Sequence, residues 1–153
     1  MTEADRKNAL FLEDLHVGQR FISGTHLLDV EQIVAYARQY DPQPFHTDPV
    51  AAKDTMFGGL AASGWHTMSL TMRLLVESVP LAKGVIGGGG EIAWPMATRP
   101  GDVIHVVSEI VDIVPSRSRP ERAMVLLRSK TRNQKDEVVQ TLTAKLVVYR
   151  RDA

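Results

Sequence analysis

The sequence predicts an α+β fold in which an antiparallel β-sheet wraps a long central α-helix. Helical patterns occupy the first half of the chain, whereas residues from about 85 onward alternate apolar and polar side chains, as strands with one buried face do. Residues 63–78 form a helical pattern that is apolar around most of its circumference, so we expect this helix to be buried. The 153 residues are expected to form a single domain, 1–153, in which 1–19 is a partly irregular N-terminal extension.

The first elements are expected to be a strand and an amphipathic helix. A short apolar and polar alternation predicts the strand over residues 20–28. Asp29 is a typical helix N-cap, and apolar residues spaced as i, i+3, i+4 and i+7 predict the helix over residues 30–40. Pro42 and Pro44 end this helix, because proline lacks the N–H donor that a helix interior requires.

A short helix, the long helix and four strands are expected to follow. Asp48 as a cap and Pro49 at the first helical position predict the short helix. Ser63 is the expected N-cap of the long helix. Period-two patterns predict strands over residues 85–95, 102–114, 122–132 and 138–150. The turn sequences at 100–102 and 133–136 are expected to join neighbouring strands as hairpins. The glycines 87–90 precede a strand and no Gly-Lys-Ser sequence, so we expect close packing against the central helix rather than a phosphate loop.

Composition and charge exclude several classes of protein. Eighteen basic residues balance eighteen acidic ones, so no strong positive field is expected to attract a nucleic acid. No run approaches the roughly 20 apolar residues that span a bilayer, and the charged start of the chain lacks the apolar stretch of a signal peptide. We therefore expect a cytoplasmic protein with no membrane or nucleic-acid partner. Cysteine is absent, which excludes disulfide and thiol chemistry.

The segment 41–48 contains the side chains best suited to chemistry. It places the carboxylate of Asp41 and the imidazole of His46 five residues apart on a proline-rich loop between two helices, where both could face one pocket. On local sequence alone, the simpler interpretation is a turn residue, a surface histidine and, at Asp48, a helix cap. The spacing of His46, Asp48 and His66 fits no zinc or iron signature, so no metal is expected.

This segment resembles the hydratase signature of MaoC-like proteins. In that signature an aspartate, any residue, an asparagine, a proline, an apolar residue and a histidine occur in order, and here the sequence reads D-P-Q-P-F-H, followed by T-D-P-V-A-A. The family also has a glycine at the start of the central helix, which Gly64 in A-A-S-G-W-H-T-M matches. A third match is I-A-W-P-M-A-T-R-P-G-D-V-I, so the resemblance covers most of residues 20–148.

The resemblance implies a hotdog fold, a homodimer and an acyl-CoA thioester substrate, with no cofactor beyond the coenzyme A of the substrate itself. The implied reaction is the reversible addition of water to a trans-2-enoyl-CoA, in which Asp41 and His46 are the catalytic acid/base pair. The backbone N–H of Gly64 would hold the thioester oxygen, because the first turn of a helix has unpaired donors, and Ser63 would cap the same helix.

Three positions depart from the family pattern and leave the substrate open. Gln43 stands where asparagine is common, Ser63 where many members have histidine, and Met72 where some enoyl hydratases have serine. Two alternatives to a hydratase also stay open: a hotdog thioesterase and a non-catalytic protein that binds acyl thioesters. Thioesterases of this fold generally have a carboxylate on the central helix, and residues 64–75 contain none. The sequence does not determine the acyl chain length, the stereochemistry, the carrier or the physiological direction.

Overall fold

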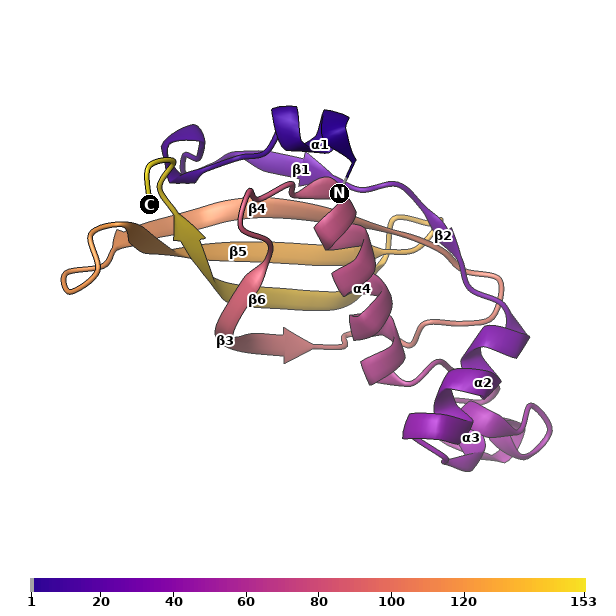
Figure 1. Cartoon of the computed structure of the whole chain (residues 1–153). Coiled ribbons are helices and arrows are strands. Elements are labelled where there is room, and N and C mark those ends of the chain that lie inside the picture. The colour runs from indigo at the N-terminus through magenta and orange to yellow at the C-terminus, as the bar shows by residue number, and fades with distance from the viewer. Residues whose placement is uncertain (1) are drawn as a thin grey trace.

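The computed structural model describes residues 2–153 of the chain (Figure 1). Most of the helical residues precede the four long strands, as predicted. The elements are α1 (Glu3–Lys7), the 3-10 helix η1 (Leu12–Asp14), β1 (Arg20–Ile22), β2 (His26–Leu27), α2 (Val30–Tyr40), α3 (Pro44–Thr47), the 3-10 helix η2 (Ala51–Asp54), α4 (Gly64–Ser78), β3 (Ile86–Ala93), β4 (Val103–Pro115), β5 (Arg122–Arg132) and β6 (Val138–Tyr149).

The strands form one antiparallel sheet in the order β1-β4-β5-β6-β3, and β2 also pairs with β4. The strands β4, β5 and β6 follow one another as hairpins, as predicted. However, β3 pairs with β6, with Ile92 opposite Leu142, and not with β4. The expectation that the turn at 100–102 joins paired strands is therefore wrong. Residues 94–102 instead cross from the β3 edge to β4 and pass the start of α4, where Thr98 accepts a hydrogen bond from the backbone N–H of Ala62.

The long helix α4 lies across one face of the sheet (Figure 1), and its bounds agree with the predicted helix to within one residue. Its buried residues Leu74 and Leu75 face the sheet, and the core around Leu75 is formed mainly by Ile110, Val125, Leu127, Leu146 and Val148. The helix is not buried all round, because Trp65 and Val76 are exposed on the single chain. Within residues 2–153, no helix is both long and apolar enough to cross a membrane.

Hydroxyl groups buried between α4 and the sheet satisfy one another. Thr71 Oγ1 of α4 lies 2.6 Å from Thr131 Oγ1 of β5, and Ser108 Oγ of β4 lies 2.8 Å from Ser129 Oγ of β5. A buried hydroxyl without a partner is costly, so these pairs favour one position of the helix on the sheet and one strand register.

The strand predicted over residues 20–28 is divided into β1 and β2 by Ser23. The backbone N–H of Ser23 donates to the carbonyl of Val106 at 2.9 Å, while its hydroxyl oxygen accepts from the Val106 N–H at 2.8 Å. A side chain thus replaces a backbone acceptor at this point of the ladder, which local alternation of apolar residues does not reveal.

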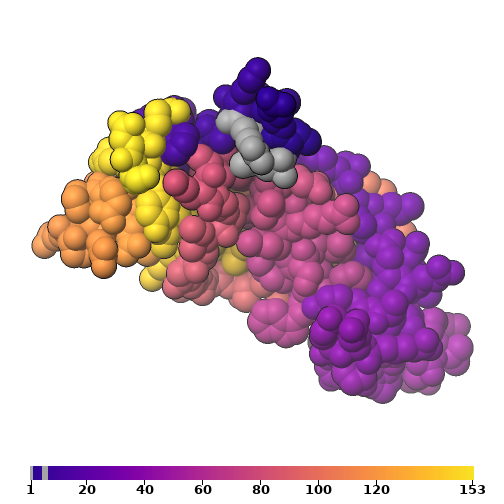
Figure 2. Space-filling view, viewed as in Figure 1, coloured from indigo at the N-terminus to yellow at the C-terminus, as the bar shows by residue number. Residues whose placement is uncertain are grey.

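The helices α2 and α3 and the 3-10 helix η2 form a lobe at one end of the sheet (Figure 1), which protrudes from the molecule in the space-filling view (Figure 2). As predicted, Asp29 caps α2, and its Oδ1 accepts the N–H of Gln32 at 2.9 Å. Residues 44–47 are helical rather than a loop, because Pro44 occupies the first helical position. The short helix predicted after Asp48 is the 3-10 helix η2, but it starts at Ala51 with Val50 at the N-cap position, so the prediction of Pro49 as its first residue is wrong.

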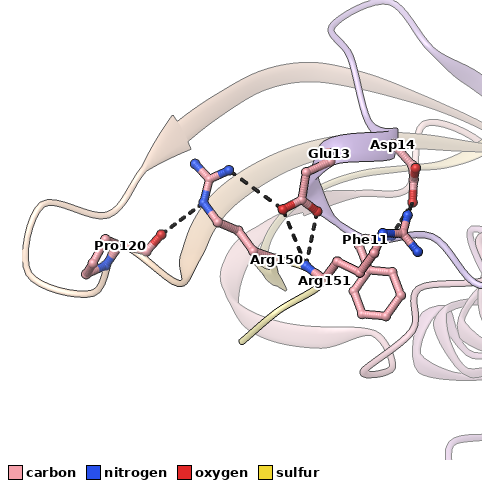
Figure 3. A network of polar contacts seen from close by, with 6 residues as sticks. All are labelled: Phe11, Glu13, Asp14, Pro120, Arg150 and Arg151. Carbon is pink, nitrogen blue, oxygen red and sulfur yellow. Dashed lines mark hydrogen bonds and ion pairs between the residues drawn. The ribbon is translucent and has the colours of Figure 1, made fainter.

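An exposed polar network joins the segment before β1 to the end of the chain (Figure 3). The Glu13 carboxylate accepts the backbone N–H of Arg151 at 3.1 Å and lies 3.8 Å from the Arg150 guanidinium. The Arg151 guanidinium donates to Asp14 at 2.8 Å and lies 4.6 Å from the centre of the Phe11 ring. Exposed ion pairs contribute about 0–1 kcal/mol each, so this network adds modestly to the packing that holds the segment in place.

Candidate active site

The first candidate pair, Asp41 and His46, is brought together by the end of α2 and the start of α3. Asp41 follows the last residue of α2, and Pro44 starts α3 so that His46 lies on its inner side and is buried. Asp41 Oδ2 lies 3.3 Å from His46 Nε2. The simpler interpretation of a surface histidine is therefore wrong, and the two side chains form a contact pair.

The surroundings of His46 determine which nitrogen carries its proton. Nδ1 lies 2.7 Å from the carbonyl oxygen of Ala61, which can only accept, so we assign the proton of the neutral ring to Nδ1. Nε2 lies 3.3 Å from Asp41 Oδ2, which accepts, so this contact becomes a hydrogen bond when Nε2 takes up a proton. The rings of Phe45 and Phe57 pack against the imidazole, with centroids 4.6 Å and 5.9 Å away, and help to exclude water from it.

Two neutral donors hold the Asp41 carboxylate. Gln43 Nε2 donates to Oδ1 at 2.5 Å, and Ser63 Oγ donates to Oδ2 at 2.7 Å. Partial burial opposes ionisation of Asp41, but these two hydrogen bonds and the nearby His46 outweigh it and lower the pKa of the carboxyl group. Asp41 is therefore ionised at neutral pH.

Ser63 precedes α4, as predicted, but its hydroxyl makes no capping hydrogen bond to that helix. The hydroxyl donates to Asp41 instead. The prediction of a side-chain cap is therefore wrong. The side chain of Ser63 is directed to the charged carboxylate of Asp41, and a hydrogen bond to a charged acceptor is a strong one.

Gly64 is the first residue of α4, and no hydrogen-bond acceptor for its backbone N–H occurs among residues 2–153. A free donor at a helix start lies at the positive end of the helix dipole. Gly64 and His46 line the same cavity, of about 300 Å³, which we call the His46 cavity. Its other lining residues are Met56, Phe57, Ala62, Thr67, Trp94, Met96, Ala97 and Thr98. Asp41 and Ser63 are not among the lining residues and lie behind His46.

Trp94 explains why residue 64 is glycine. A Cβ atom built on Gly64 would lie 2.7 Å from the indole Cε2 of Trp94. No real Cβ tolerates such a distance, so the indole packs directly on the backbone at the start of α4. An aromatic ring therefore occupies part of the space that the glycine leaves open beside the start of α4.

Arg99 stabilises the part of the His46 cavity wall that contains Phe57. Its guanidinium donates to the carbonyl oxygens of Phe57 at 2.5 Å and Gly59 at 3.0 Å, and so fixes the loop that carries Phe57. Three residues of this wall were not predicted as site residues: Trp94, Thr98 and Arg99. All three lie in the A-W-P-M-A-T-R-P-G-D segment, whose match to the family was the available signal.

A second cavity, of about 280 Å³, lies between α4 and the β3 edge of the sheet, and we call it the apolar cavity. Its walls are almost entirely hydrocarbon, and they are formed by Trp65, Met68, Met72, Leu75, Val85, Ile92, Leu142, Ala144 and Leu146 together with residues 87, 89, 90 and 91. Glycines 87, 89 and 90 therefore border this cavity, and the prediction that they pack closely against the helix is wrong. Gly90 has its closest approach to β6, where a Cβ would meet the Thr143 carbonyl.

His66 lies outside the candidate pair and its cavity. The ring is buried and stacks on Tyr36, with centroids 4.4 Å apart. Within the described chain its Nδ1 has no hydrogen-bond partner. Burial, with a smaller effect of His26, lowers the pKa of His66 to about 4, so the ring is neutral at neutral pH. Among residues 2–153, no group of three or more His, Cys, Asp or Glu side chains is arranged to hold a metal ion.

The arrangement is suited to moving one proton next to a polarised carbonyl group. A proton taken from water can be held between His46 Nε2 and the ionised Asp41, and the free N–H of Gly64 can donate to an oxygen in the same cavity. Thr67 and Thr98 add hydroxyl groups to the cavity wall, 3.1 Å apart.

Comparisons with known proteins identify the family of the chain. The family model of the MaoC like domain matches residues 16–133. The crystal structure of the MaoC-like dehydratase from Rhodospirillum rubrum is 57% identical, covers 94% of this chain and 99% of its own, and superposes with a TM-score of 0.92. The R-hydratase PhaJ1 from Pseudomonas aeruginosa, at 22% identity, shares the fold with a TM-score of 0.77, covering 94% and 88% of the two chains. The 3-hydroxybutyryl-CoA dehydratase of Methylorubrum extorquens is 27% identical over 119 residues, 74% of this chain and 72% of the relative.

Proposed function

Since the chain belongs to the family of MaoC-like domains and has its α+β hotdog fold, we propose that it is an enoyl-CoA hydratase or 3-hydroxyacyl-CoA dehydratase. The observation that carries this proposal is the contact between the ionised Asp41 and His46, beside a cavity that also contains the N–H of Gly64. The names of the relatives from Rhodospirillum rubrum and Methylorubrum extorquens support dehydration as the reaction class and an acyl-CoA as the substrate class.

In the proposed hydration, a water molecule lies between the catalytic pair and the double bond of a trans-2-enoyl-CoA. The water oxygen forms a bond to C3 and gives one proton to the Asp41 and His46 pair, and the pair then transfers one proton to C2 and returns to its starting state. The electron pair of the double bond moves toward the thioester carbonyl, whose oxygen gains negative charge. The N–H of Gly64 stabilises that oxygen, and the reverse sequence removes water from the 3-hydroxyacyl-CoA.

The proposed working unit is a homodimer that takes an acyl-CoA thioester and needs no further cofactor. Two features of the single chain support a second copy. The strand β3 pairs on one side only, with β6, and α4 exposes apolar side chains, including Trp65 and Val76, next to it. A free sheet edge beside an apolar helix face is a typical protein interface.

The experiment that tests this function is a steady-state assay with trans-2-butenoyl-CoA, which follows the loss of the enoyl thioester absorbance. Asp41→Ala and His46→Ala should each lower kcat by several orders of magnitude, and the double variant should be little worse than the weaker single variant, because the two residues act as a unit. The exposed His16 supplies the control, since His16→Ala should keep wild-type turnover.

Two results would contradict the proposal. Near-normal hydration by His46→Ala would show that the pair does not catalyse the reaction. Release of free thiol from acyl-CoA without hydration would identify a thioesterase. We do not expect this result, because the first acidic residue of α4 is Glu77, which is paired with Arg73 near the end of the helix.

A further inference from the structure

Trp94 lies where the His46 cavity and the apolar cavity approach each other. The two cavities share the helix α4 as a wall, but from adjacent residues: Gly64 and Thr67 line the first, whereas Trp65 and Met68 line the second. Trp94 lines the His46 cavity, and its indole contacts Trp65 edge to face, with ring centroids 5.5 Å apart. The indole therefore lines the His46 cavity and contacts, through Trp65, a side chain that lines the apolar cavity.

The indole is fixed in this position by contacts with two elements, β6 and α4. Its Nε1 donates to Gln140 Oε1 of β6 at 2.9 Å, and the fully buried Gln140 in turn donates to Thr71 of α4 at 3.1 Å. The ring also rests on Gly64, where any side chain would displace it. Such a hydrogen bond and close packing leave the indole little freedom to swing aside.

The same contacts connect Trp94 to the lining of the apolar cavity. Gln140 Nε2 lies 3.5 Å from the Met68 sulfur, and Met68 lines that cavity. A continuous layer of side chains thus crosses the molecule. It consists of Trp94 directly after β3, Gln140 of β6 and Thr71 of α4. This layer separates the polar end of α4, where the thioester is proposed to react, from the hydrocarbon space farther along the helix.

We propose that Trp94 is a specificity-determining residue that closes the His46 cavity against the apolar cavity and restricts the enzyme to short acyl chains. This inference rests on the proposed function. The His46 cavity, of about 300 Å³, must hold the thioester carbonyl, the two reacting carbons and the attacking water, and the indole of Trp94 bounds the space that remains for the acyl chain. Removing the indole joins to it an apolar space of about 280 Å³ in which further methylene groups can bind.

The test compares kcat/KM for trans-2-butenoyl-CoA and trans-2-octenoyl-CoA in Trp94→Ala, Trp94→Phe and the wild type. Each methylene group that enters an apolar cavity strengthens binding by roughly fourfold, so Trp94→Ala should raise the octenoyl to butenoyl ratio by at least about tenfold. Trp94→Phe keeps most of the wall and should leave the ratio nearly unchanged. Met96 lines the same cavity and is as exposed as Trp94, 42% against 40%, so Met96→Ala is the matched control and should not raise the ratio.

Folding and binding measurements keep the inference separate from the proposed function. If Trp94→Ala does not fold by circular dichroism, Trp94→Leu takes its place with the same expected direction. If the wild type hydrates no enoyl-CoA, the proposed function fails, and calorimetric Kd values for the saturated butyryl-CoA and octanoyl-CoA decide the inference instead. A wild type that already prefers the octenoyl substrate, or a folded Trp94→Ala whose chain-length ratio matches that of Met96→Ala, overturns the role of Trp94.

Discussion

At the scale of single residues, the ionisation of Asp41 depends on a hydroxyl that the family pattern does not share. Burial works against the charged carboxylate, and the hydrogen bond from Ser63 is one of the interactions that outweigh burial and lower the pKa of Asp41. A carboxyl group with a lowered pKa contributes stability and activity above its ordinary value of 3.8, and loses them as pH falls through its folded value.

Ser63→Ala should therefore raise the pKa of Asp41. The acid limb of the kcat/KM profile should move to higher pH, whereas kcat at pH 7 should fall by roughly tenfold or less, since one hydrogen bond is lost and the carboxylate stays ionised. The control is Ser78→Ala, because the hydroxyl of Ser78 donates to the Leu74 carbonyl at the other end of α4. An acid limb that is identical in Ser63→Ala and the wild type would contradict the assigned role of Ser63.

His66 predicts a second pH dependence, which affects stability rather than catalysis. Its pKa in the folded protein is about 4, below the ordinary value of 6.5, because the ring is buried. Above pH 6.5 the ring of His66 is neutral in both the folded and the unfolded chain. Between pH 6.5 and 4 only the unfolded chain binds the proton, so the free energy of unfolding falls through this window, by up to about 3 kcal/mol, and levels off below it.

Replacing His66 by phenylalanine should remove this pH dependence. His66→Phe keeps an aromatic ring against Tyr36 and has no group that titrates. Urea unfolding at pH 7 and pH 5 should show a smaller loss of stability in His66→Phe than in the wild type, with His16→Ala behaving as the wild type does. An equal loss in all three proteins would show that His66 is not the titrating group.

At the scale of elements, the start of α4 combines a structural and a proposed chemical role. Gly64 accommodates the indole of Trp94, so a substitution tested alone would change packing as well as chemistry. Proline is otherwise acceptable at this position, because it is the first helical residue and Ser63 has the extended backbone, φ −55° and ψ 139°, that proline requires before it. The donor can therefore be removed without breaking the helix.

The N–H donor is best tested in a Trp94→Ala background. There, Gly64→Ala and Gly64→Pro both add a Cβ, but only proline removes the N–H. If this donor stabilises the thioester oxygen, kcat for butenoyl-CoA should be about 10² to 10³ lower in the Gly64→Pro double variant than in the Gly64→Ala double variant. Equal turnover in the two folded proteins would show that the oxygen is held elsewhere.

The local elements could be predicted from the sequence, whereas their pairing could not. The bounds of α2 follow from its Asp29 cap and 3.6-residue periodicity. Those of α4 follow from the periodicity, and the long strands follow from period two. The pairing of β3 with β6 is determined by contacts distant in sequence, since Gly90 approaches the backbone of Thr143 more closely than any other residue type permits. The turn sequence at 100–102 indicates a turn, but a turn does not specify which strands pair.

The candidate site likewise has one part that could be predicted from the sequence and one part that could not. Asp41 and His46 are five residues apart, so a local motif identified them, and the structure brings them into contact. Trp94 is held by a hydrogen bond to Gln140, which lies 46 residues later in the sequence. Arg99 is held by a hydrogen bond to the carbonyl of Phe57, which lies 42 residues earlier. Local patterns carry no information about such partners, so the walls of the cavity were visible only in the folded chain.

At the scale of the whole molecule, the single chain leaves an apolar surface that a second copy would cover. Val76 of α4 is 50% exposed and Trp65 is 58% exposed, and the adjacent β3 has one unpaired edge. We expect sedimentation at micromolar concentration to give a mass near twice 16.9 kDa. The midpoint of thermal unfolding should rise with protein concentration, because association stabilises the folded chain by mass action.

Val76→Asp should shift the protein toward the monomer, because the dimer would have to bury a charge without a partner. Val50 provides the matched control: it is a valine with 73% of its surface exposed, and it lies in the lobe between α3 and η2, away from β3. Val50→Asp should therefore remain a dimer at the same concentration. Both variants should keep the wild-type circular dichroism spectrum, since neither side chain belongs to the core. If the wild type sediments at about 17 kDa, or if Val76→Asp and Val50→Asp sediment alike, the face formed by α4 and β3 is not the interface.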